Sequence, residues 1–95
     1  MPNVKIYNAV KININCQIHH DSVDGKYSTL APASVILRNV KIGDYTYIGA
    51  NSTIRQNIKI GNNCIIGAGS VVTKDIKNSE VVIGSPVRFL RKNKN

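Results

Sequence analysis

Aliphatic residues recur at every sixth position along this chain. In steps of six from Ile6 to Val72, eleven of twelve positions are Ile, Leu or Val, and the exception is Asp24. A period of six matches neither the 3.6-residue turn of an α-helix nor a long strand with alternating faces. It is typical of very short strands joined by sharp turns, in which each strand points one large side chain inward.

Small residues complete each hexad. The residue after the aliphatic one is often glycine, and the fourth residue after it is usually Ser, Thr or Cys. We interpret the glycines as corner residues whose backbone conformation disfavours a Cβ atom. The Ser, Thr and Cys side chains are small enough for a narrow interior. Three hexads per coil would form a triangular prism of parallel strands, so the repeat predicts an all-β structure of about four coils over residues 1–75.

Residues 76–95 leave the hexad register. Their sequence, IKNSEVVIGSPVRFLRKNKN, predicts a final pair of strands followed by a short basic tail. Because the chain has only 95 residues, we expect the repeat and this C-terminal segment to form a single domain.

The chain is strongly basic, with 13 Lys and Arg residues against 5 Asp and Glu residues and a formal net charge of +8. Four of the cations lie among the last eight residues: Arg88, Arg91, Lys92 and Lys94. A nucleic-acid-binding surface would need a continuous basic stripe interleaved with aromatic residues. The other cations are scattered over outward positions, so we expect no nucleic-acid partner.

Two further classes are disfavoured by composition. No apolar stretch approaches the roughly 20 residues of a membrane span, and the N-terminal sequence lacks a secretory signal. We therefore expect a soluble, cytoplasmic protein that does not bind membranes. The two cysteines, Cys16 and Cys64, lie far apart without metal-ligand spacing, so we expect neither a disulfide scaffold nor a metal cofactor.

Both histidines of the chain are adjacent, in the segment IHHDSVDG at residues 18–25. Counted from the inward Ile18, His20 and Asp21 fall at a corner, where side chains point outward. A histidine beside a carboxylate can act as a general base with a fixed tautomer. His19 is the alternative base, and a solvated polar corner without chemistry is the alternative interpretation.

Several segments resemble one known family. The hexads, together with IHHDSVDG (18–25), NVKIG (39–43), YIGANS (47–52), IIGAGS (65–70) and IGSPVR (83–88), are similar to the hexapeptide-repeat acetyltransferases. The subgroup contains sialic acid O-acetyltransferase and the UDP-4-amino-sugar N-acetyltransferase of the bacillosamine pathway. The resemblance implies a left-handed parallel β-helix, whereas general crossover rules favour the right-handed connection.

The resemblance also implies a function. The family transfers acetyl from acetyl-CoA to an amino or hydroxyl group of a sugar, here expected to be nucleotide-linked, and works as a homotrimer. Within the subgroup, His20 corresponds to the general base and Asp21 to the acid that raises its basicity. Asn13 corresponds to an amide residue near the substrate, although it fits an ordinary polar corner equally well.

The family binds acetyl-CoA in the groove between neighbouring subunits. Residues at acetyl-CoA-contact positions are Thr29, Gly49, Ala50, Gly67 and Ala68, and Arg88 lies where relatives hold the nucleotide end of the cofactor. Ala50 and Ala68 are eighteen residues apart, so they should stack on one edge of consecutive coils. Gly-Ala corners also suit the fold itself, which is the structural alternative for these residue types.

The chain departs from the family pattern at three points. Thr29 stands where relatives often have a second histidine. Asp24 replaces an inward aliphatic residue, and because a buried carboxylate is costly unless paired, we expect it either to bond near the His20 corner or to distort its coil. The N-terminal α/β nucleotide-binding domain of full-length relatives is absent from this sequence.

These departures leave alternatives to a sugar acetyltransferase. The first is a truncated, catalytically incomplete β-helix that acts only as a trimerisation module. Serine and antibiotic acetyltransferases share the scaffold, although the unbroken hexads argue against the long loop of the antibiotic class. A zinc-dependent γ-type carbonic anhydrase would need three spaced histidines, which this chain does not have.

Overall fold

The computed structural model describes residues 5–6, 11–12 and 14–94, and in this part the chain forms only strands and turns. The first twelve strands have two residues each: β1 (Lys5–Ile6), β2 (Lys11–Ile12), β3 (Gln17–Ile18), β4 (Val23–Asp24), β5 (Thr29–Leu30), β6 (Val35–Ile36), β7 (Lys41–Ile42), β8 (Tyr47–Ile48), β9 (Thr53–Ile54), β10 (Lys59–Ile60), β11 (Ile65–Ile66) and β12 (Val71–Val72). Two longer strands follow, β13 (Glu80–Gly84) and β14 (Val87–Lys92). Within the described residues, no helix is long and apolar enough to cross a membrane.

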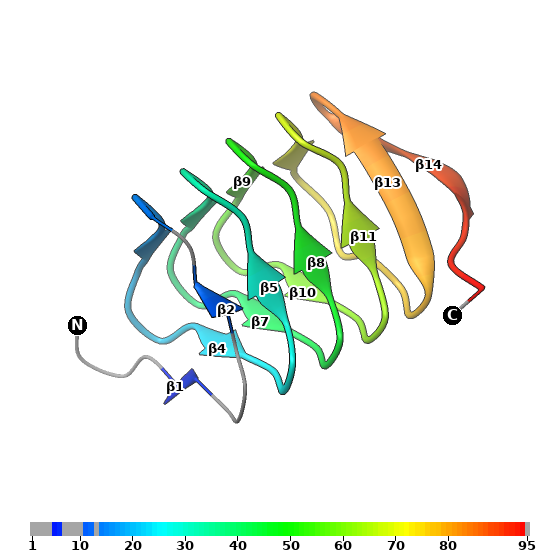
Figure 1. Ribbon diagram of the computed structural model, residues 1–95. Coiled ribbons are helices and arrows are strands. Elements are labelled where there is room, and N and C mark those ends of the chain that lie inside the picture. Colours follow the sequence, from blue (N-terminus) through cyan, green and yellow to red (C-terminus); the bar gives the residue numbers. More distant parts are fainter. Residues whose placement is uncertain (1–4, 7–10, 13, 95) are drawn as a thin grey trace.

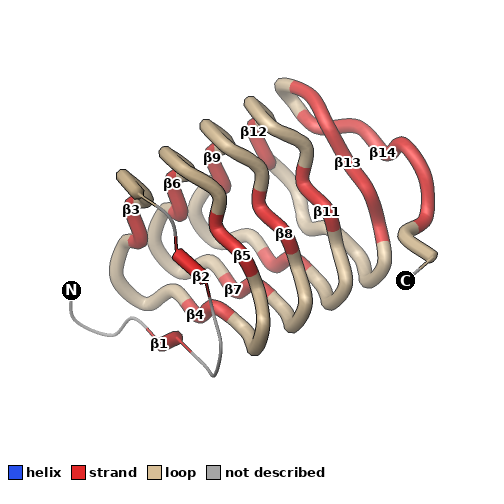
Figure 2. The backbone as a smooth tube through the Cα atoms, viewed as in Figure 1, coloured by secondary structure: helices blue, strands red, loops and turns tan. Residues whose placement is uncertain are grey.

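The strands build three sheets around one axis, and within the coils all strand pairs are parallel (Figure 1). Sheet A has the order β1-β4-β7-β10, sheet B the order β2-β5-β8-β11-β13-β14, and sheet C the order β3-β6-β9-β12. Each strand from β1 to β9 pairs with the strand three hexads later, as Thr29 does with Tyr47 and Tyr47 with Ile65. The prediction of a triangular prism with three hexads per coil is therefore confirmed. Figure 2 shows how short the strands are relative to the turns that join them.

The C-terminal segment completes one side of the prism. β13 continues sheet B in parallel beside β11, and β14 folds back antiparallel to β13. The side chain of Asn93 then donates to the backbone oxygen of Asn63 at 3.1 Å, which ties the end of the described chain to an earlier turn.

In β3 to β12 the second residue is buried and points into the prism, where aliphatic side chains stack along the axis. Ile48 and Ile66, for example, are fully buried one above the other in sheet B. In these ten strands the first residue faces outward. Because period-two alternation is reduced here to one inward and one outward residue per strand, the outer face of each sheet is set by the first residues of these strands.

The recurrent glycines do not lie where a left-handed backbone is needed, so our interpretation of them was wrong. Left-handed φ angles occur two residues after the glycine position, at residues such as Asn51 (58°) and Asn57 (64°). The glycines allow close approach of the next coil instead. A Cβ atom on Gly49 would lie 2.6 Å from the nitrogen of Ala68, which is shorter than any real contact.

The small residues at the fourth position are buried, as expected, and they also join consecutive coils. The hydroxyl of Ser22 donates to the backbone oxygen of Leu37 at 2.8 Å, and that of Thr46 donates to Gly61 at 2.7 Å. Buried polar groups are costly unless they are hydrogen-bonded, and these bonds satisfy the interior hydroxyl groups.

Asp24 corrects both expectations that we drew from its sequence. Its side chain is only 3% exposed, yet β4 pairs in regular register with β1 and β7, so the coil is not distorted. Its partner is Ser28 in the next turn, whose hydroxyl donates to Oδ1, and not the His20 corner. Burial raises the pKa of Asp24 to about 6, against the opposing effect of the Ser28 hydrogen bond.

Candidate functional site

The turns of successive coils stack into three edges. The histidine edge joins sheets C and A and contains residues 20–21, 38–39 and 56–57. The tyrosine edge joins sheets A and B and contains residues 26–27, 44–45 and 62–63. The alanine edge joins sheets B and C and contains residues 32–33, 50–51 and 68–69.

His20 and Asp21 lie in the first described turn of the histidine edge. Both side chains are exposed, and Asp21 has a left-handed φ of 61°. In the described part of the chain, their side chains form no hydrogen bond with each other. His19 is half-buried and follows β3. Its backbone N–H donates a hydrogen bond to the backbone oxygen of Ile36 at 2.8 Å. Of the two histidines, His20 is therefore the more accessible to a substrate.

The histidine edge also carries an arginine that our sequence analysis did not single out. Arg38 occupies the turn position equivalent to His20 in the next coil, and the backbone N–H of Asn39 donates to the oxygen of His20 at 3.1 Å. The eighteen-residue spacing between His20 and Arg38 could have identified Arg38 from the sequence, because eighteen residues make one coil. An exposed cation one coil from His20 favours an anionic group at this edge.

Ala50 and Ala68 occupy equivalent turns of the alanine edge, as their spacing predicts. The backbone N–H of Gly69 donates to the oxygen of Ala50 at 2.8 Å across the two coils. Gly49 and Gly67 follow β8 and β11, and the space that a Cβ would need there is filled by the next coil, by Ala68 and Ile83 respectively. The small side chains of Ala50 and Ala68 keep the turns of this edge free of large groups. The arrangement would let an extended ligand approach the backbone.

The remaining predicted cofactor residues lie on sheet B. Thr29 is the outward residue of β5, and Arg88 is exposed in β14, where it pairs with Ile83. The structure thus gathers all six predicted cofactor residues on sheet B and its alanine edge. It does not bring them to His20 and Asp21, which lie on the histidine edge opposite sheet B. Asn13 lies outside the described residues.

Lysines dominate the outer face of sheet A. Lys41 and Lys59 are exposed and pair in register on β7 and β10. Within the described chain, no three His, Cys, Asp or Glu side chains are grouped so as to hold a metal ion.

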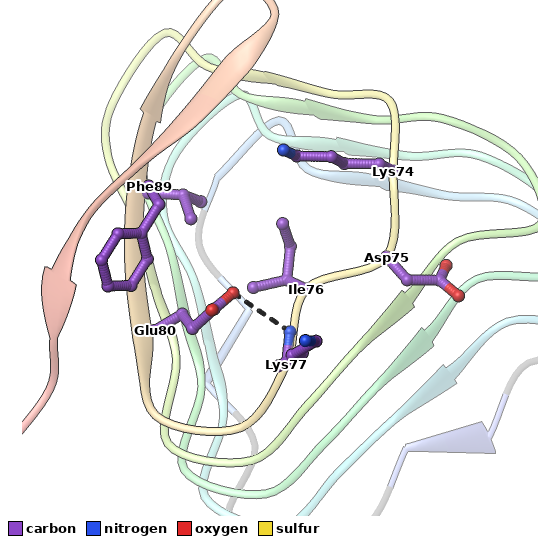
Figure 3. Close-up of a pocket in the computed structure, with 7 residues that line it drawn as sticks. Lys74, Asp75, Ile76, Lys77, Glu80 and Phe89 are labelled. Atoms are coloured by element: carbon purple, nitrogen blue, oxygen red, sulfur yellow. Dashed lines mark hydrogen bonds between the residues drawn. The ribbon is translucent and has the colours of Figure 1, made fainter.

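A cavity of about 300 Å³ lies at the C-terminal end of the prism, away from all of these residues (Figure 3). It is lined by Lys74, Asp75, Ile76, Lys77, Glu80, Val82 and Phe89. At this end of the prism, the side chain of Glu80 accepts a hydrogen bond from the backbone N–H of Lys77 at 3.3 Å. None of the predicted site residues takes part in it.

Residues 39–74 match the family model of the bacterial transferase hexapeptide (six repeats). A comparison with curated proteins gives no match to this sequence. Among solved structures, WeeI from Acinetobacter baumannii AYE is 36% identical with a TM-score of 0.89, and the alignment covers 93% of this chain and 44% of WeeI.

Two other solved structures are more distant in sequence. VCA0836 from Vibrio cholerae, a hexapeptide-repeat acetyltransferase solved with acetyl-coenzyme A, is 24% identical with a TM-score of 0.89, and the alignment covers 98% of this chain and 62% of that protein. A variant of perosamine N-acetyltransferase from Caulobacter crescentus, solved with CoA and GDP-perosamine, is 22% identical with a TM-score of 0.75, with coverages of 95% and 54%. At these identities the two likenesses show a shared fold alone.

The chain spans less than two thirds of each of these three proteins. The repeat match covers residues 39–74, and the structural match to WeeI covers 93% of this chain. The chain therefore contains hexapeptide repeats and has the left-handed parallel β-helix fold.

Proposed function

We propose that this chain is an acetyltransferase β-helix that moves acetyl from acetyl-CoA to an amino or hydroxyl group of a sugar, which is nucleotide-linked. The observation that carries the proposal is the separation of two sets of residues on one scaffold. An exposed His–Asp pair occupies one edge, and a side-chain-poor Gly-Ala edge with Thr29 and Arg88 occupies the other side. VCA0836 was solved with acetyl-CoA and the perosamine N-acetyltransferase with CoA and GDP-perosamine, which supports the two substrate classes.

In this proposal His20 is the general base. Its imidazole takes the proton of the acceptor amine or hydroxyl while the acceptor nitrogen or oxygen attacks the thioester carbonyl. The C–N or C–O bond forms, the C–S bond breaks, and the imidazolium returns the proton to the departing CoA thiolate. Asp21 stabilises the imidazolium, and a base of this kind contributes about 10²–10⁴ in rate.

The cofactor wall is formed by sheet B and the alanine edge. Ala50 and Ala68, with Gly49 and Gly67 beside them, let the pantetheine arm run along the backbone. Arg88 offers a guanidinium to the phosphates at the nucleotide end.

The site is completed between copies of the chain. Because the base and the cofactor wall lie on different sides of one prism, a single chain cannot bring them together. We therefore include a homotrimer in the proposal, in which one copy supplies His20 and Asp21 and its neighbour supplies the cofactor wall. Asn13 remains the proposed substrate-contacting residue.

Isothermal titration of the purified chain with acetyl-CoA, together with its mass in solution, tests the proposal. Micromolar binding to a trimer is the expected result, followed by acetyl transfer to a nucleotide-linked amino sugar. A trimer that binds no acetyl-CoA would contradict it.

A structural module is the second candidate. The observation that favours it is that His20 and Asp21 lie on the edge opposite the cofactor wall, so one copy of the chain does not form a complete site. In that case the titration would give no heat of binding, whereas the chain would still assemble.

A further inference from the structure

The outer edge of β14 is an unpaired strand edge at the C-terminal end of the prism. β14 is the last strand of sheet B, and in the described part of the chain it pairs only with β13 (Figure 1). It is also the longest strand there, with six residues. Alternate backbone N–H and C=O groups of an edge strand point away from its one partner. They are therefore open to an extended peptide that adds to the sheet as a further strand.

The two sides of this edge strand carry different side chains. Opposed residues of an antiparallel pair point to the same side of the sheet. Phe89 lies opposite Val82, whose side chain belongs to the buried core, so Phe89 is on the inner side. Arg91 lies opposite Val81, the neighbour of Val82 along β13, so Arg91 is on the outer side. A strand added to β14 would therefore meet an aromatic ring on one side and a guanidinium group on the other.

The inner side of β14 leads into the cavity at the end of the prism. Phe89 lines this cavity together with the buried side chains of Ile76 and Val82 (Figure 3). Sheets A and C have no strand beside β14, and Phe89 is 49% exposed. An apolar side chain on the inner side of an added strand would cover Phe89 and enter the cavity, whose volume is about 300 Å³.

This end of the molecule is strongly basic. Residues 74–94 contain six Lys and Arg residues and two acidic residues. Both acidic side chains already accept backbone N–H groups, Asp75 from Lys59 at 2.9 Å and Glu80 from Lys77 at 3.3 Å. Within the described residues, none of the six cations forms an ion pair. Charge complementarity therefore favours an acidic partner, and the same cations would repel the β14 edge of a second copy.

We propose that the free edge of β14 binds an extended acidic peptide of a partner protein, which adds to sheet B as a further strand. Acidic side chains of the peptide face Arg91 on the outer side. Apolar side chains cover Phe89 and enter the cavity on the inner side. Acidic and apolar residues therefore alternate in the peptide, because successive side chains of a strand point to opposite sides. The contact requires neither His20 nor acetyl-CoA, so it goes beyond the proposed function.

Binding of a synthetic peptide tests the proposal. The probe has six residues, the length of β14, with glutamate and valine in alternation and a fluorescent label at one end. Fluorescence anisotropy with the full 95-residue chain should show saturable binding. A matched peptide with lysine in place of every glutamate should bind at least about tenfold more weakly. The proposal would be overturned if the glutamate peptide did not bind saturably, or if both peptides bound equally.

Two charge reversals locate the contact on the chain. Arg91→Glu should weaken binding of the glutamate peptide at least about tenfold. Arg55→Glu is the matched control, because Arg55 is an exposed arginine that follows β9 of sheet C and its reversal changes the net charge equally. Circular dichroism would report the fold of both variants. Equal weakening by the two reversals would show a general attraction to a basic protein and would contradict binding at β14.

Backbone pairing has its own signature, which the wild-type chain can show. A strand pairs along one edge through the N–H groups of alternate residues. N-methylation of one alternate set of peptide residues should therefore abolish binding, whereas methylation of the other set should leave it. Amide hydrogen exchange of residues 87–92 should slow in the complex. Equal loss from both methylated peptides would refute strand addition, and so would protection of residues 87–92 in a dimer of the chain without peptide.

Discussion

The hydroxyl of Ser28 donates a hydrogen bond to the buried carboxyl group of Asp24, one turn earlier in the same coil. The second carboxyl oxygen, Oδ2, has no partner among the described residues. Asp24 stands in the column of inward residues, directly before Ile42 of the next coil. An ionisable group therefore occupies a core position that hydrophobic packing alone would give to isoleucine.

Stability should fall as the pH rises through the pKa of Asp24. Burial raises this pKa from 3.8 to about 6, so the charged form is less favourable in the folded chain than in the unfolded one. The stability contributed by the protonated carboxyl group is fully present below the unfolded pKa of 3.8 and is lost as the pH rises through the folded pKa of about 6. The difference corresponds to about 3 kcal/mol at pH 7.

Urea denaturation between pH 4 and pH 7.5 would measure this effect. Asp24→Asn is the control, because it keeps a hydrogen-bonding side chain of similar size without the titration. The two proteins differ in this one side chain, so the difference between the two curves isolates Asp24. Parallel curves would show that the carboxyl group has an ordinary pKa.

Replacing Asp24 with isoleucine should stabilise the chain at neutral pH. The change removes a buried charge and continues the aliphatic column, and Ser28 keeps the backbone oxygen of Gly25 as an acceptor at 2.9 Å. We expect a gain of about 1–3 kcal/mol in the free energy of unfolding. A loss of stability at pH 7 would show that the carboxyl group has a partner that this account lacks.

His20→Ala should lower the rate of acetyl transfer by about 10²–10⁴ while acetyl-CoA binding and assembly are retained. The matched control is His19→Ala, which removes the half-buried neighbour and should leave most of the rate. Steady-state kinetics with the preferred acceptor, alongside titration with acetyl-CoA, would separate the two. If His19→Ala were the inactive variant, the base would be His19.

Gly49→Ala should destabilise the fold by more than about 2 kcal/mol. Its Cβ would lie 2.6 Å from the nitrogen of Ala68 and 2.7 Å from the oxygen of Ile66, which are backbone atoms that cannot move freely. Gly69→Asn is the control, because Gly69 has a φ of 70° with open space around it and Asn tolerates that conformation. Thermal melting of both variants would test the pair. Equal melting temperatures would contradict the close approach of the coils.

The hexad pattern predicted the coils because three kinds of residue position share one period. Inward aliphatic residues such as Ile48 and Ile66, small residues at the fourth position and glycines between them all repeat with the same period, so a shift in register would bury polar side chains. The His–Asp corner followed from the same count. Handedness did not follow from it, and came from the family resemblance and the repeat match.

Tertiary structure decided what the repeat leaves open. The reason for the glycines could not be read from one coil, because the atoms that exclude a Cβ at Gly49 belong to the next coil. Asp24 breaks the pattern, and only the fold shows Ser28 close enough to bond it. The sequence by itself determined the period, the core and the composition of each edge, since these depend on neighbours along the chain. The placement of His20 opposite the cofactor wall was decided by closing three strands into a triangle, because that closure sets which edges can share one groove.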